Sequence, residues 1–168
     1  MRIKDAIAEI VAKVQAKYNG GDETPYFMYG RPMKIAQLLS EKDESKEWKY
    51  RKYPLIILIQ EFTEHRGMNL ESDTDVTIVI VTQADPRNTT ENRDDDNFNN
   101  ILYPIYEVFL NELKKSTRFK FSSGIEHDLT ESPYWGTPGQ YGNSANVMND
   151  TLDALFIENL NLKLLKIC

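Results

Sequence analysis

Two runs rich in aliphatic and β-branched residues lie close together in the middle of the chain. Residues 53–62 (YPLIILIQEF) contain the first run and residues 75–84 (DVTIVIVTQA) contain the second. Continuous apolar runs of this length predict strands that are buried on both faces, so the first should be central in a sheet. We expect the second to be its antiparallel partner. The polar residues 64–74 between them, with Gly67, predict a long hairpin loop.

The remaining periodicities predict helices and shorter strands around this pair. Apolar residues at helical spacing predict helices over residues 3–18, 32–39 and 98–116. Pro104 lies inside the last of these, so we expect a kink or a break there. Shorter strands are predicted over residues 25–30, 119–121 and 153–165. In the last strand the alternation changes near Glu158 and Asn159, which indicates a register change.

The order of these elements predicts an α+β fold. Strands occur in runs rather than in regular alternation with helices, which favours a mainly antiparallel sheet. The N-terminal helix and the broken central helix should pack on one face of that sheet. The chain has 168 residues and no internal repeat, which fits one domain. A domain of this length needs no disulfide or metal to hold it, and its single cysteine is Cys168.

Charge and hydropathy limit the classes of partner. The net charge of −6 does not supply the cationic face that binding of a phosphate backbone requires. Residues 46–53 (KEWKYRKY) form a local basic strip, either a nucleic-acid contact or a solvated connector. Charged residues interrupt the N-terminal apolar pattern, unlike a signal peptide, and the longest aliphatic run, residues 55–59, is too short for a bilayer. We therefore expect no membrane partner and a protein that is intracellular, at least where it is made.

Few residues suggest catalysis. His127 is next to Asp128, but adjacent residues of a strand point to opposite faces. The run Asp94–Asp96 could bind a divalent metal, or it could stabilise the start of a helix, and the glycine and distal glutamate of a calcium loop are absent. Capping is the favoured interpretation, so we expect no catalytic residue, metal or cofactor. The alternative is a metal-dependent nuclease or hydrolase that uses Asp94–Asp96 with His127.

A long segment rich in glycine, proline and aromatic residues follows. Residues 124–150 predict a projecting loop, with ESPYWGTPGQYG at residues 131–142. Tyrosine and tryptophan are good interface anchors, so Tyr134, Trp135 and Tyr141 are candidate contacts with another chain. The other interpretation is that Trp135 covers the core of its own domain. A second candidate contact is the hairpin loop, with His65, Arg66 and Met68.

Five segments of the chain resemble the tail-completion or tail-terminator family of bacteriophage neck proteins. They are KYPLIILIQEF (52–62), DVTIVIVTQAD (75–85), NILYPIYEVFL (100–110), HDLTESPYWG (127–136) and NDTLDALFIENLNLKL (149–164). The order of elements agrees as well, so the resemblance extends from about residue 1 to residue 164. None of these motifs is catalytic.

The resemblance implies a structural component of the virion. Proteins of that family are small α+β subunits that form homo-oligomeric rings at the head–tail junction, between the portal or connector and the tail. The resemblance thus implies that this chain associates with itself, with connector (adaptor) proteins and with tail proteins, and has no enzyme activity. The acidic charge suggests that genomic DNA passes through the lumen of such a ring without specific binding.

Overall fold

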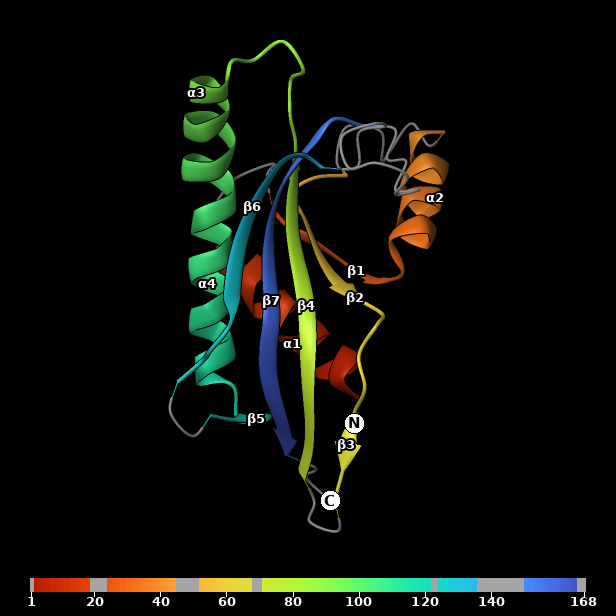
Figure 1. The fold of residues 1–168 in the computed structure, drawn as a ribbon, viewed down its shortest axis with the longest axis vertical. Helices are drawn as coiled ribbons and strands as arrows, with labels where there is room; N and C mark the ends of the chain where they lie inside the picture. Colours follow the sequence, from red (N-terminus) through yellow and green to blue (C-terminus); the bar gives the residue numbers. More distant parts are fainter. Residues whose placement is uncertain are drawn as a thin grey trace.

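The computed structural model describes residues 2–18, 24–44, 52–67, 71–121, 124–135 and 150–165. These residues form a curled sheet with helices on both faces (Figure 1). The helical elements of these residues are α1 (Ile3–Lys17), α2 (Pro32–Asp43), α3 (Thr90–Arg93), the π-helix η2 (Asp94–Leu102) and α4 (Tyr103–Lys115). The strands are β1 (Tyr26–Gly30), β2 (Leu55–Ile59), β3 (His65–Arg66), β4 (Glu71–Gln83), β5 (Phe119–Lys120), β6 (Asp128–Trp135) and β7 (Leu152–Leu165).

The sheet is mainly antiparallel, as the sequence predicts. Within the described residues its main path runs β1-β2-β4-β7-β5, and β3 pairs with β4 while β6 pairs with β7. Only β1 and β2 are parallel among these pairs. The two central aliphatic strands are antiparallel partners, with Leu55 opposite Val81. The α+β fold class and this central pairing are therefore confirmed.

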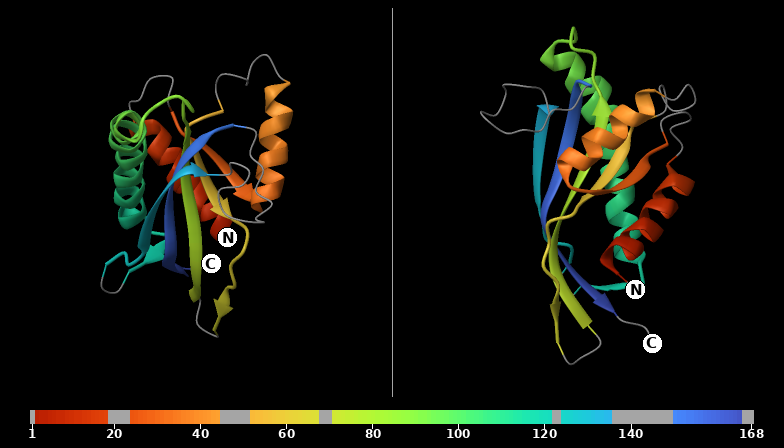
Figure 2. Two further views of the ribbon diagram at one scale, coloured as in Figure 1. Left: turned by 45° about the horizontal axis from the view of Figure 1, so that its top comes forward. Right: turned by 90° about the vertical axis from the view of Figure 1, so that its right-hand side faces the viewer.

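Strand β2 contributes to a core on each face of the sheet. Ile56 and Leu58 pack with α1, η2 and α4, whereas Leu55 and Ile57 pack with Ile35 of α2. Figure 2 shows α1 and the long helix of η2 and α4 on the same side of the sheet. The predicted packing of the N-terminal and central helices on one face is confirmed. Helix α2 covers part of the opposite face.

The register change predicted in the last strand is present. Val76 pairs with Leu160 but Ile78 pairs with Ile157, so β7 contains an extra residue at this point. Asn159 has a φ of 53°, a left-handed conformation that asparagine tolerates better than most residues. The extra residue is a β-bulge, which bends the strand and increases its twist.

Of the kink or break expected at Pro104, the break is absent. Helical structure continues from Thr90 to Lys115, and the irregularity is the π-helix that precedes the proline. The N–H of Tyr103 donates to the carbonyl of Phe98, five residues earlier. Pro104 falls in the first turn of α4. Widening the helix before the proline accommodates the missing N–H without ending the helix.

Two segments predicted to be loops contain strands. Within residues 64–74, β3 pairs with β4, with His65 opposite Asp73. Within residues 124–150, β6 pairs with β7 from Asp128, opposite Glu158, to Trp135, opposite Leu152. Both strands have polar or exposed side chains, so the alternation of apolar residues that identifies a strand is weak in them. Residues 136–149 of the predicted loop lie outside the described part of the chain.

One buried carboxylate joins the two helices on the shared face. Glu112 of α4 is almost completely buried, and its Oε1 lies 2.6 Å from Lys17 Nζ of α1 and 3.5 Å from Lys115 Nζ. The hydrogen bond from Lys17 lowers the pKa of Glu112 below its ordinary value of 4.5. The pair therefore holds the C-terminal end of α1 against α4.

We expect Glu112→Gln to lower the free energy of unfolding at pH 7 by about 1–3 kcal/mol. Because the folded chain lowers the pKa of Glu112, the carboxylate stabilises the fold above pH 4.5, and this contribution is lost as the pH falls through the folded pKa. The difference between variant and wild type should thus shrink in acid, as measured by urea unfolding at each pH. Glu107→Gln, at an exposed position of the same helix, is the control. An equal effect of both variants would contradict this role.

Candidate functional site

A buried ion pair joins the start of the long helix to the sheet. Arg93 and Asp153 are 2% and 0% exposed, and their Nη2 and Oδ1 atoms lie 2.5 Å apart. Arg93 Nε donates to Asp153 Oδ2 at 3.1 Å, and Asn97 Nδ2 donates to the same oxygen at 2.6 Å. The backbone N–H of Tyr134 donates to Oδ1 at 3.2 Å. One carboxylate thus connects α3, η2, β6 and β7.

The guanidinium of Arg93 is also covered by an aromatic ring. Its Cζ lies 3.5 Å from the centroid of the Tyr134 ring, a cation–π contact. Burial alone would lower the pKa of Arg93, but the hydrogen bond and charge of Asp153 outweigh it and raise that pKa. Tyr134 has a φ of 59°, and the β6–β7 register shifts between Ser132 and Trp135. The strained residue is held in place by its bond to Asp153 and its stacking on Arg93.

Trp135 lies in the core of its own chain. It is 6% exposed and packs with the cluster of α2 and β2 that also contains Leu152. Its ring makes an edge-to-face contact with Phe156, with centroids 5.6 Å apart. The expectation that Trp135 projects as an anchor for a neighbour is therefore wrong, and the alternative interpretation of the sequence holds. Tyr134 is half-buried against Arg93, and Tyr141 lies outside the described residues.

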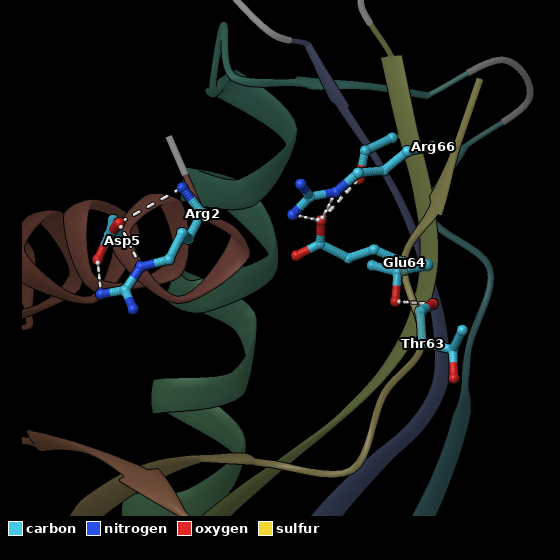
Figure 3. Close-up of polar contacts among 7 residues, drawn as sticks. Arg2, Asp5, Thr63, Glu64 and Arg66 are labelled. Atoms are coloured by element: carbon cyan, nitrogen blue, oxygen red, sulfur yellow. Dashed lines mark hydrogen bonds and ion pairs between the residues drawn. The ribbon is translucent and has the colours of Figure 1, made fainter. Parts of the chain in front are cut away.

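The second candidate contact is a protruding β-hairpin. Strand β4 continues past β2 and pairs there with β3, at the lower end of the molecule (Figure 1). His65 and Arg66 of β3 are exposed, and Met68 lies outside the described residues. Arg66 Nη2 forms an ion pair with Glu64 at 2.7 Å, and Thr74 Oγ1 donates to the Thr63 carbonyl at 2.9 Å (Figure 3). This ion pair and this hydrogen bond lie within the hairpin and stabilise it.

A polar hollow of about 570 Å³ lies beside this hairpin. Its lining includes Arg31, Phe62, His65, Asp73, Asp75 and Asn161. Asn161 Nδ2 donates to Asp73 Oδ1 at 2.9 Å and to Asp75 Oδ1 at 3.0 Å. The side-chain amide of Asn161 thus bridges the carboxylates of Asp73 and Asp75, which are two residues apart on the same face of β4. The hollow is open to solvent and polar, unlike an enclosed pocket for a small molecule.

The metal-dependent nuclease or hydrolase hypothesis needs Asp94–Asp96 and His127 to form a metal site, and they do not form one in the described residues. Within those residues, no three His, Cys, Asp or Glu side chains are grouped so that they could hold a metal ion. Asp94–Asp96 are exposed. These acids lie in the first turn of η2 but do not cap the helix, because Thr89 Oγ1 accepts the N–H of Asn92 at 3.3 Å and caps it one turn earlier. His127 Nε2 lies 2.8 Å from the hydroxyl of Tyr106.

The basic strip contributes a structural contact where it is described. Lys52 is buried, and its Nζ lies 2.5 Å from Asp150 Oδ2. The hydroxyl of Tyr53 donates to the same oxygen at 2.9 Å. Residues 45–51 lie outside the described part of the chain. Lys52 therefore holds the segment before β2 against the start of β7.

In the described residues, no helix is long and apolar enough to cross a membrane.

Sequence reasoning missed the group around Asp153. Arg93 and Asn97 lie about one helical turn apart and share a face, but 56 or more positions separate them from Asp153. A lone aspartate between Leu152 and Ala154 gives no local sign of its partner. The helix start could have been found, because Thr89 is followed by Glu91 and Asn92, a pattern typical of a capped N-terminus.

We expect Asp153→Asn to lower the free energy of unfolding by about 3–5 kcal/mol, because it leaves the Arg93 charge buried without its counter-ion. Urea unfolding followed by circular dichroism measures the change. Asp95→Asn is the matched control, since Asp95 is exposed on the same helix as Arg93. A loss no larger than that of the control would show that the ion pair does not stabilise the fold.

Trp135→Ala should destabilise the fold by about 3–5 kcal/mol, the usual effect of removing a large aromatic side chain from a core. Thermal unfolding measures it, and Leu129→Ala, at an exposed position of the same strand, should change little. If the variant keeps its unfolding temperature but loses association with other chains, Trp135 is an interface anchor after all.

No protein-family model matches the chain, and no curated protein matches it.

Proposed function

We propose that this chain is a structural, ring-forming component of a phage virion, located at the head–tail junction between the connector and the tail. The proposal rests on the resemblance of five segments to neck proteins and on one structural observation. That observation is the β3–β4 hairpin, which extends the sheet beyond the helices (Figure 1) and exposes His65 and Arg66. A hairpin held by its own hydrogen bonds suits contact with an adjoining protein better than catalysis.

The organisation of polar residues supports an architectural role. Arg93 and Asp153, the most buried charged groups among the described residues, are paired with each other and connect the long helix to the sheet. The polar hollow beside the hairpin is open to solvent, and two of its carboxylates, those of Asp73 and Asp75, are bridged by Asn161. The ring would associate with itself, with connector proteins and with tail proteins.

The test of this function is the location of the protein in particles. Purified virions of the phage that encodes the chain should contain it in a ring at the neck by cryo-electron microscopy, and the isolated protein should form a closed oligomer by native mass spectrometry. Arg66→Glu should reduce incorporation into particles, because it reverses a charge on the exposed hairpin. Arg87→Glu is the control, at an exposed site outside the hairpin. A monomer that is absent from particles would contradict the proposal.

A further inference from the structure

Among the described strands longer than two residues, β1 and β6 each have a free edge, and these two edges differ in character. Within the described residues, β1 pairs only with β2, and β6 pairs only with β7. We call the free side of Tyr26–Gly30 the β1 edge, and the free side of residues 128–132 the β6 edge. The β1 edge is five residues long. The β6 edge has the same length, because Pro133 and the register shift after Ser132 end the regular part of β6.

The hydrogen-bond pattern shows which residues of β1 face outward. Tyr26 N–H donates to the Pro54 carbonyl at 3.0 Å, and the Gly30 carbonyl accepts from Gln60 N–H at 3.1 Å. Residues 26, 28 and 30 therefore direct their backbone groups toward β2. Because direction alternates along a strand, Phe27 and Tyr29 direct theirs to the β1 edge.

The same reasoning applies to β6. Ala84 N–H donates to the Thr151 carbonyl at 2.9 Å, so the backbone groups of residue 151 point toward β4. Because this direction alternates, odd-numbered residues of β7 before the bulge direct their backbone groups to β4, and even-numbered residues direct theirs to β6. Phe156 and Glu158 are opposite Thr130 and Asp128, which thus face β7. Leu129 and Glu131 are left directing their backbone groups to the β6 edge.

The two edges fit each other in direction and in face. Strand direction is kept from β1 to β2 and reverses at β4, β7 and β6, so β1 and β6 run in opposite directions. Rotation about an axis along the strands keeps these directions, so β6 of one copy would meet β1 of the next antiparallel. Phe27 and Tyr29 face the core of α1 and α4. Leu129 and Glu131 face the same side, opposite Ile157 and Leu155 of that core.

The two edges also carry opposite charge. Lys4 Nζ lies 5.5 Å from the ring centroid of Tyr29 on the β1 edge, and Arg31 directly follows β1 and is exposed. On the β6 edge, Asp128 accepts from Asn159 and Glu131 from Tyr103, both neutral donors. Among the described residues, no lysine or arginine forms an ion pair with either carboxylate.

We propose that neighbouring copies of this chain associate by pairing the β1 edge of one copy with the β6 edge of the next, in an antiparallel register with Met28 opposite Thr130. In this register Tyr29 lies opposite Leu129, and Phe27 lies opposite Glu131. The outward-facing backbone groups of both strands then meet as hydrogen-bonded pairs. Leu129, which is 37% exposed in the single chain, is covered by Tyr29. This inference rests on the proposed ring and specifies its interface.

Disulfide trapping tests the register. Cys168 is first replaced by serine, and Met28→Cys and Thr130→Cys are then introduced together. Residues of an antiparallel pair that are not hydrogen-bonded have Cα atoms about 4.5 Å apart, which suits a disulfide. Oxidation should give a ladder of covalent multimers on a non-reducing gel. A mixture of the two single variants should give covalent dimers only.

The matched control combines Tyr29→Cys with Thr130→Cys, whose side chains would lie on opposite faces of the joined sheet. It should give little cross-linking. An oligomer that stays intact by native mass spectrometry but gives no ladder, or gives one equally with the control, overturns this interface and leaves the ring in place. A chain that is monomeric at every concentration overturns the ring and the interface together.

A second variant separates association from folding. Leu129→Pro removes an N–H that points to the β6 edge and leaves the bonds between β6 and β7 intact. It should abolish the oligomer while the unfolding temperature stays close to that of the wild type. Leu129→Ala keeps the N–H and should keep the oligomer. A folded Leu129→Pro variant that still oligomerises would contradict the proposed pairing.

Discussion

The ion pair between Arg93 and Asp153 fixes how the long helix lies on the sheet. Leu152 and Ala154 point to the core of α2, so the side chain of Asp153 points to the opposite core, beneath the start of the helix. Charges removed from water destabilise a fold unless their partners are well placed. Here both carboxylate oxygens accept hydrogen bonds, from Arg93, Asn97 and the backbone of Tyr134. Helix, β6 and β7 must therefore meet in one arrangement.

The bulge in β7 keeps the apolar side chains of this 14-residue strand on one face of the sheet. Leu155 and Ile157 are odd-numbered, whereas Leu160, Leu162 and Leu164 are even-numbered, yet all five pack in the core of α1 and α4. Strict alternation would place the two groups on opposite faces. The extra residue at the bulge restores the match, and the strand can therefore continue to the protruding hairpin, where β4 pairs with its last residues.

The sequence predicted the features that depend on local pattern and missed those that depend on distant partners. Aliphatic runs identified β2 and β4, and the change of parity at Glu158 and Asn159 identified the bulge. Strand β6 was missed, because its first four residues are exposed and its end contains a proline. Trp135 was assigned to an interface because a tryptophan among glycines and prolines is equally typical of a binding loop. Its burial depends on Phe156, which lies 21 positions later.

The charges of the two open edges also limit how copies of the chain can meet. An edge that carries Asp128 and Glu131 repels an identical edge, and an edge flanked by Lys4 and Arg31 does the same. Symmetric pairing of like edges is thus disfavoured, and only unlike edges attract. An interface between two different surfaces of the same chain is heterologous, and repetition of such an interface gives a closed ring or an open filament.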